Sequence, residues 1–275
     1  HWNYTHTTEV YDSSDRLWAR IDRIKLWRFY LPFHDVNFHG PKDVYFLCDR
    51  WPEAMPPETS TAGGNACCVV RLKELSDLKQ PALQLAGARV MLSPVELDEY
   101  LHLQRPDDKK AEWLFGRAAA KDAVRFLLRD VAGERPFMAD VEITTDAYGR
   151  PLCRPRAGNQ QTVAGPVEYP YVSIAHTAGH IAAIAAQTPT VGIDLERVVP
   201  RDESFLQLAF DEEEQRMLAD MDDRDEWVAR FWCAKEAVGK GLGRGLPSGP
   251  RSVSIGQADP RSGTIGVTLG PALAE

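Results

Sequence analysis

The sequence carries two long helical patterns that resemble each other, AEWLFGRAAAKDAVRFLL at residues 111–128 and EWVARFWCAKEAVGKG at residues 226–241. Each contains a Glu-Trp pair and, at the same distance after it, an Ala-Lys-acid-Ala-Val run, at 120–124 and 234–238. This repetition predicts a duplicated half, although two amphipathic Ala/Lys helices can also match by accident. We therefore expect an α+β fold, a pseudo-dimer of two similar α/β halves, each a small antiparallel sheet packed with a long helix. The active site is expected in the cleft between the halves.

Turn and capping signals place shorter elements around these helices. Ser93, followed by a proline and then by Glu96, predicts a capped helix start. The acidic run that begins at Asp211 suits the positive end of another helix. Runs of β-branched or small apolar residues predict strands. These strands are expected at 17–30, 66–72 and 141–145, as a pair within 172–186, and at 191–196.

Composition predicts four regions along the chain. Residues 52–65 are rich in Pro, Gly, Ser and Thr and are expected to be a linker. The strand-rich residues 1–51 are too few to fold alone. The two expected halves are then 66–170 and 171–275. Because the chain begins with His1, we interpret it as a piece of something longer.

The overall composition excludes several classes of protein. The chain has 275 residues, 44% of them hydrophobic, and a formal charge of −8. Its pI near 5.5 argues against general nucleic-acid binding, and its mean hydropathy of −0.34 argues against a membrane protein. Five scattered cysteines without zinc spacing indicate a reducing, cytoplasmic compartment.

Carboxylates near the second helix suggest a cation site. Asp194 and Glu196 leave the same face of the expected strand, where two like charges repel each other unless a cation compensates. Glu236 and Lys240 are neighbours on one helix face. Such a set suits Mg²⁺ bridging the protein to a phosphorylated substrate, whereas the alternative is a solvated strand end beside a surface ion pair.

The residues around these carboxylates resemble the paired signature of the 4'-phosphopantetheinyl transferases. The signature consists here of VGIDLE at 191–196 and FWCAKEAVGK at 231–240. SIAHT at 173–177 is similar to the short strand motif of that family, and YGRP at 148–151 to its G-(K/R)-P turn. The duplicated halves match the surfactin-type (group II), pseudo-dimeric branch.

The resemblance implies a Mg²⁺-dependent holo-[acyl-carrier-protein] synthase. Coenzyme A would donate its phosphopantetheine arm to a serine of an acyl carrier protein, releasing 3',5'-adenosine bisphosphate. The metal ligands of the family fall on Asp194, Glu196 and Glu236, and Lys240 would reach a phosphate oxygen. Either Glu236 or Glu214 would take the serine proton as general base.

The resemblance also implies contacts to coenzyme A. Arg150 and His176 would hold its phosphates, and Lys110 and Arg117 are further candidates for the 3'-phosphate. Ala175 stands where the family usually has serine, so one side-chain phosphate contact is expected to be missing.

The expected protein partner is an acyl carrier protein or the carrier domain of a polyketide synthase. Carrier proteins of this kind are acidic, so the helix cations are expected to form part of a docking rim. Residues 18–51 resemble the closing strands of polyketide synthase dehydratase domains, which implies a transferase fused to such a synthase and a role in antibiotic biosynthesis. The expected rim cations are Arg105, Lys109, Lys110, Arg117, Lys121, Arg125 and Arg129.

Two other readings stay open at this point. One is a catalytically weak module that docks carrier proteins without chemistry, for which Ala175 leaves room. The other is a general Mg²⁺ phosphohydrolase, which would release phosphate from coenzyme A without a carrier protein.

Overall fold

A computed structural model describes residues 3–11, 14, 16–27, 46–54, 67–72, 81–156 and 169–274. The chain divides into two compact units, 1–35 and 36–275. In the first unit β1 (Asn3–Tyr11) pairs antiparallel with β2 (Leu17–Trp27), with two irregularities in the register. The extended structure expected from Leu17 is therefore confirmed as far as Trp27. Most of the expected linker, from residue 55, lies outside the described residues.

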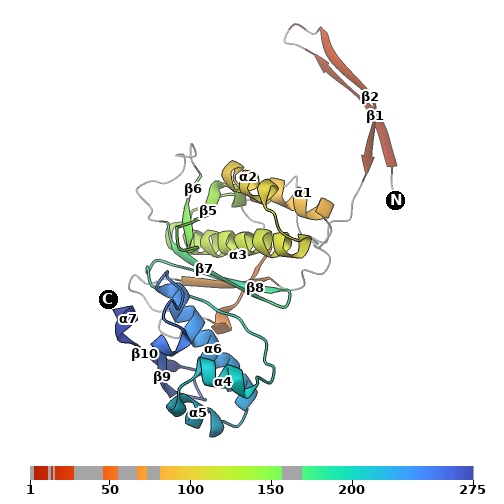
Figure 1. Cartoon of the computed structure of the whole chain (residues 1–275). Helices are drawn as coiled ribbons and strands as arrows, with labels where there is room; N and C mark the ends of the chain where they lie inside the picture. Colours follow the sequence, from red (N-terminus) through yellow and green to blue (C-terminus); the bar gives the residue numbers. More distant parts are fainter. Residues whose placement is uncertain are drawn as a thin grey trace. The chain divides into compact units, whose positions relative to one another are not determined.

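A four-stranded antiparallel sheet organises the second unit (Figure 1). Its order is β3 (Asp49–Arg50), β4 (Cys67–Leu72), β8 (His180–Ala186) and β7 (Tyr171–Thr177). The expected strands at 66–72 and within 172–186 are thus confirmed. Because β4 and β8 pair directly, the sheet combines strands from both expected halves.

Three helices lie on one side of this sheet, and only the longest of them packs against it. They are α1 (Pro81–Met91), α2 (Pro94–His102) and α3 (Asp107–Ala132). The long α3 contacts β4, β7 and β8, and in Figure 1 it lies between that sheet and the α1–α2 pair. Alanines line both sides of this contact, and their small side chains allow the helix to approach the sheet closely.

A hairpin follows the long helix. A 3₁₀ turn (Met138–Asp140) leads into β5 (Val141–Thr145), which pairs antiparallel with β6 (Pro151–Pro155). The Asp146 carboxylate accepts the backbone N–H groups of Tyr148 and Arg150 across the tight turn. Gly149 has φ of 84°, a conformation that favours glycine. The strand and turn expected here are confirmed.

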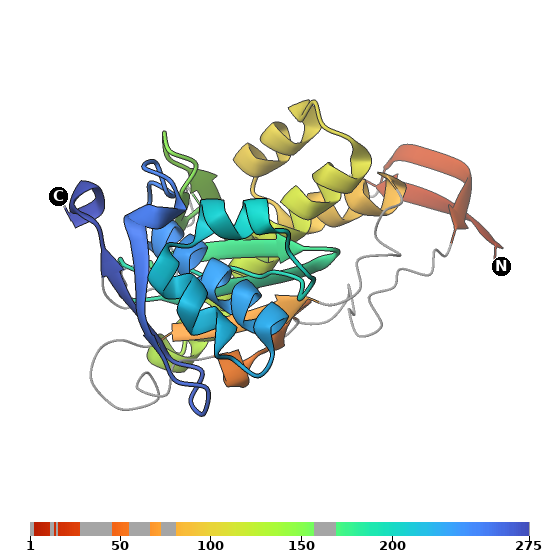
Figure 2. The same cartoon turned by 60° about the horizontal axis from the view of Figure 1, so that its bottom comes forward.

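Residues 203–274 build a second helical group, which Figure 2 shows beside strand β9. An N-cap precedes each of its first three helices, and a 3₁₀ turn (Pro250–Ser252) precedes its hairpin. The first three helices and the hairpin share a core around Phe210 and Phe231, both 0% exposed. The elements are α4 (Glu203–Ala209), α5 (Glu212–Ala219), α6 (Arg224–Gly241), β9 (Val253–Ala258), β10 (Ile265–Leu269) and α7 (Pro271–Ala274).

The order of elements repeats along the second unit. A capped short helix, a long helix, a 3₁₀ turn and an antiparallel hairpin occur first as α2, α3, β5 and β6, and again as α5, α6, β9 and β10. None of the described helices is long and apolar enough to cross a membrane.

The prediction of a strand at 191–196 is wrong. Residues 191–200 have neither helix nor strand structure. Side chains, and not a neighbouring strand, bind the backbone of Ile193. The Ser173 hydroxyl accepts its N–H, and the Lys240 ammonium donates to its carbonyl. The segment therefore lies against α6 instead of joining a sheet.

Gly192 sets how closely this segment approaches α6. A Cβ at this position would lie 1.8 Å from the backbone oxygen of Ala237, and neither backbone can give way cheaply. We expect Gly192→Ala to lower the free energy of unfolding by at least about 3 kcal/mol, a large case of overpacking. Denaturant titration beside Gly256→Ala, whose added Cβ meets nothing closer than 3.9 Å, provides the check. Equal stability of the two variants would contradict this close contact.

Candidate functional site

A pocket of about 470 Å³ opens between α3, the β5–β6 turn, the end of β7 and the loop after α6. Five of its lining side chains are cations, and Glu112 is the one acid among the lining residues. This excess of positive charge suits an anionic ligand. The charged and aromatic lining residues are Arg105, Lys109, Glu112, Trp113, Arg117, Tyr148, Arg150, His176 and Lys240.

Helix α3 supplies one wall of the pocket. Arg117 is only 7% exposed, and its guanidinium lies 3.4 Å from the centre of the Trp113 ring and 3.3 Å from a Glu99 oxygen. Its Nε has no hydrogen-bond partner. Desolvation lowers the Arg117 pKa, although the Glu99 carboxylate opposes this. Lys109 lines the pocket where the sequence had pointed to its neighbour Lys110.

The opposite wall comes from the β5–β6 turn and β7. The Arg150 guanidinium donates to the Pro189 carbonyl and lies 5.6 Å from the centre of the Tyr171 ring. His176, near the end of β7, is half-exposed, and its Nδ1 is 3.8 Å from a Glu112 oxygen. Four of the five residues expected to contact coenzyme A therefore line one pocket, namely Arg117, Arg150, His176 and Lys240.

Lys240 joins this pocket to the acidic residues. Its Nζ lies 2.8 Å from Asp194 Oδ1 and donates to the backbone carbonyls of Ile174 and Ile193 at 3.2 and 3.1 Å. The same side chain lines the pocket. A ligand phosphate in the pocket can therefore reach an ammonium group that already touches a carboxylate.

We call Asp194, Glu196 and Glu236 the acidic group. Asp194 Oδ2 is buried without a hydrogen-bond partner, and Glu196 pairs with Arg201 at 3.1 Å. Desolvation raises the Glu236 pKa, and the charge of Asp194 raises it further. Burial, followed by the charge of Asp194, also raises the pKa of Cys233 to about 12. The charge of Glu196 adds to this effect on Glu236, so the three carboxylates are electrostatically coupled.

The donors of the acidic group fit a hard divalent cation. An oxygen that is buried without a partner is costly, and a cation beside Asp194 Oδ2 would compensate it. Within the described ranges, however, no three His, Cys, Asp or Glu side chains are already arranged to hold a metal ion. The fit therefore rests on the chemistry of the donors and on the partnerless oxygen.

Glu214, the other candidate for the general base, lies in the interior, 1% exposed. Its Oε1 accepts the Ile255 N–H at 2.7 Å, and its Oε2 accepts the Asp211 N–H and the Lys235 ammonium, both at 2.8 Å. With both oxygens bound inside the fold, this geometry favours a structural role for Glu214.

Three cations expected on the docking rim are buried, namely Arg117, which lines the pocket, Lys121 and Arg125, so that expectation is wrong for them. Lys121 is 0% and Arg125 2% exposed. Arg125 pairs with Asp122, and Lys121 pairs with Glu96. The pattern of α3 had hidden this burial, because cations at these spacings usually lie on a solvated face.

Asp122 is the counterpart of Glu236 in the repeated run, and the structure uses it differently. Its Oδ2 accepts the N–H groups of Leu47 and Cys48, at 2.7 and 3.1 Å, and its Oδ1 accepts from Arg125. The carboxylate thus fixes the chain that enters β3.

The pH dependence of stability tests this role of Asp122. Desolvation raises its pKa to about 6, against the lowering effects of Arg125 and the two N–H donors. The folded chain therefore binds more protons than the unfolded chain between roughly pH 4 and 6, so this group's contribution to stability falls as the pH rises. As the pH rises from 4 to 7, we expect the free energy of unfolding of Asp122→Asn to increase by up to about 3 kcal/mol relative to that of the parent chain. A pH-independent difference in denaturant titrations would contradict this.

Other site residues were missed by sequence reasoning. Trp113 was noted only as part of the repeat, and Gly243 and Gly245 were not singled out, yet all three line the pocket. A Cβ at Gly243 would lie 2.9 Å from Arg150 Cδ. The run of glycines was the available signal, since glycine often marks a close approach.

Comparison with known proteins gives one family and several structures. Residues 190–274 match the model of the 4'-phosphopantetheinyl transferase superfamily, and this range includes the acidic group and Lys240. No curated protein matches the chain significantly.

Similar solved structures include three synthases. A holo-ACP-synthase from Plasmodium yoelii is 21% identical over 45% of this chain and 96% of its own, with a TM-score of 0.36. An ACPS–CoA complex from Chronobacterium ammoniagenes is 21% identical over the same shares, with a TM-score of 0.33. A holo-[acyl-carrier-protein] synthase from Thermotoga maritima is 24% identical over 54% of this chain and 74% of its own, with a TM-score of 0.32.

Proposed function

We propose that this chain transfers the 4'-phosphopantetheine arm of coenzyme A to a serine hydroxyl of an acyl carrier protein. In this reaction the serine oxygen bonds to the β-phosphorus, and 3',5'-adenosine bisphosphate leaves. The observation that carries the proposal is the position of Lys240, which links a cationic pocket to the acidic group. The superfamily match over 190–274 supports the reaction class.

The pocket cations would bind and orient coenzyme A. Arg150 and His176 would hold its phosphates from one wall, and Arg117 with Lys109 or Lys110 would meet the 3'-phosphate from the other. Trp113 holds the Arg117 guanidinium from one side, which limits the orientations this group can take. Fixed cations of this kind place the reacting phosphorus and neutralise charge.

The acidic group would hold Mg²⁺ through Asp194, Glu196 and Glu236. When bound, the ion would supply positive charge at the pyrophosphate. Lys240 would donate a hydrogen bond to a phosphate oxygen. We assign the general base to Glu236, because both oxygens of Glu214 are engaged in the interior.

The finer classification is also part of the proposal. The repeated order of elements supports a surfactin-type pseudo-dimer with the site between its halves. The dehydratase-like residues 18–51 support a carrier domain of a polyketide synthase as the substrate, and with it a cytoplasmic role in antibiotic biosynthesis.

Calorimetric titration with coenzyme A in the presence of Mg²⁺ tests the pocket. We expect saturable binding by the parent chain and at least about tenfold weaker binding by Arg150→Ala, because one phosphate contact is lost. Arg156→Ala, an exposed cation just after the same hairpin, is the matched control and should bind like the parent. Absence of binding by the parent chain would reject the proposed function.

A further inference from the structure

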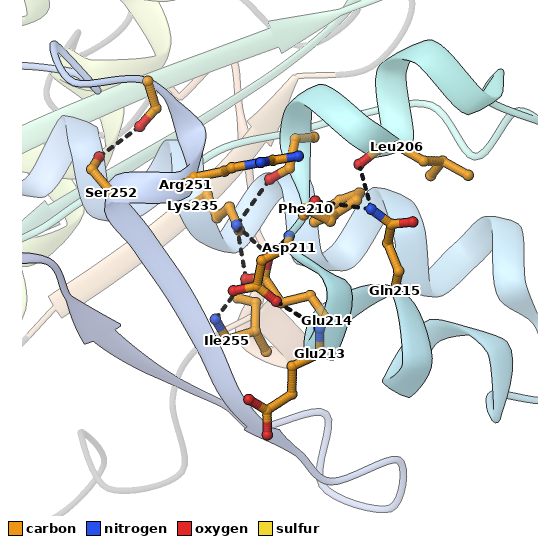
Figure 3. Close-up of polar contacts among 12 residues, drawn as sticks. Leu206, Phe210, Asp211, Glu213, Glu214, Gln215, Lys235, Arg251, Ser252 and Ile255 are labelled. Carbon is orange, nitrogen blue, oxygen red and sulfur yellow. Dashed lines mark hydrogen bonds and ion pairs between the residues drawn. The ribbon is translucent and has the colours of Figure 1, made fainter.

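Lys235 forms a buried three-way contact in the second helical group (Figure 3). Its ammonium is bound by both oxygens of Glu214, at 2.7 and 2.8 Å, and donates to the Ala209 carbonyl at 2.9 Å. Glu214 also completes the capping box of α5 with Asp211 and accepts the Ile255 N–H of β9. One ion pair thus ties the long helix to the start of a short helix and to the following strand.

Lys121 forms the same contact in the first half. Its ammonium lies 2.6 Å from Glu96 Oε2 and 2.7 Å from the Met91 carbonyl. Glu96 completes the capping box of α2 with Ser93 and accepts the Ile143 N–H of β5 at 3.2 Å. Lys121 meets one carboxylate oxygen where Lys235 meets two, and each other bond of the Lys235 contact has a counterpart here.

Stability alone is a weak reason for two buried ion pairs. Desolvating a lysine and a carboxylate is expensive, and apolar residues of similar volume often serve as well. Each pair adds a geometric constraint that apolar packing lacks. The lysine must contact both a backbone carbonyl and a carboxylate, and that carboxylate is itself held by backbone N–H groups. Such a contact fixes the position of the long helix relative to a strand.

The two contacts lie next to different parts of the proposed site. Lys121 follows Arg117 by one turn of α3, and Ile143, the strand residue of this contact, lines the pocket. Lys235 directly precedes Glu236 and lies on the same helix as Lys240. The first contact therefore fixes the pocket wall, and the second fixes the helix that carries part of the acidic group.

We propose that Glu96–Lys121 and Glu214–Lys235 are two copies of one positioning device with separate roles in the reaction. The first copy sets the affinity for coenzyme A through Arg117, and the second sets the rate of transfer through Glu236 and Lys240. This inference rests on the proposed function. Neither pair touches the reacting atoms, so both are positioning residues.

Matched variants separate the two roles. We expect Lys121→Met to raise KM and the calorimetric Kd for coenzyme A at least about fivefold with kcat within about twofold. We expect Lys235→Met to lower kcat at least about tenfold with the Kd for coenzyme A within about threefold. Both variants are assayed well below their melting temperatures, and kcat is expressed per active site.

Glu96→Gln and Glu214→Gln repeat the test if a methionine variant does not fold, because glutamine keeps the volume and one accepting oxygen. The proposal would be overturned if variants of both pairs changed the same kinetic parameter in the same way. It would also be overturned if the variants only lowered the fraction of active molecules and left kcat and KM per active site unchanged. These outcomes require an active parent chain. A parent chain that neither binds coenzyme A nor transfers its arm would instead reject the proposed function.

Discussion

Asp194→Asn is expected to lower kcat/KM for transfer about 10²–10³-fold, the scale seen when one preorganised electrostatic partner is removed from a reaction centre. Asp194 has one oxygen on Lys240 and another that is buried without a partner. Asparagine keeps the shape but loses the negative charge that would hold Mg²⁺. The expected signature is a large drop in rate with unchanged folding and a weaker response to added Mg²⁺.

The control for this variant is Glu226→Gln. Glu226 is an exposed carboxylate in the first turn of α6, where it pairs with Arg230. Its neutralisation should leave transfer within about twofold of the parent, because it is a surface pair. Full activity of Asp194→Asn, measured beside this control, would remove the metal assignment.

The second large effect concerns stability. Lys235→Met should lower the free energy of unfolding by about 3–5 kcal/mol, because it leaves the Glu214 carboxylate buried without its counter-ion. The double variant Lys235→Met/Glu214→Gln should lose less than the sum of the two single variants, since no buried charge remains. Glutamine can still accept one of the two backbone N–H groups that Glu214 binds.

Urea titration of the single and double variants provides the measurement. Arg230→Met is the control on the same helix, because its pair with Glu226 is exposed and should contribute no more than about 1 kcal/mol. Strict additivity of the two substitutions would show that the Lys235–Glu214 contact is not an energetic unit.

Local signals predicted much of the fold. The capping box of Ser93 and Glu96 is formed as expected, because its partners lie three residues apart and the pattern acts within one helical turn. The two long helices also occur where the repeat placed them, although α3 begins four residues earlier than the pattern that predicted it.

Tertiary contacts explain what the sequence did not predict. The apolar residues around Asp194 indicated a strand, but their backbone is bound by Ser173 and Lys240, which are distant in sequence. Lys121 and Glu214 look like surface charges in their helices. Their burial depends on each finding an opposite charge on another helix, and no local pattern encodes that pairing.

The candidate site was also predicted in part from sequence motifs and in part only from tertiary contacts. Arg117, Arg150, His176 and Lys240 were found through motif resemblance, and the structure places all four on one pocket. The roles of Glu214 and of the buried α3 cations could be judged only once their hydrogen-bond partners were known.

The intact mass of an apo acyl carrier protein, after incubation with this chain, coenzyme A and Mg²⁺, tests the central claim most directly. The account predicts a gain of one phosphopantetheine group on the carrier that is lost when EDTA is added. An unchanged mass for an unrelated carrier and for a polyketide synthase carrier domain alike, with coenzyme A bound, would contradict transfer and leave a docking module.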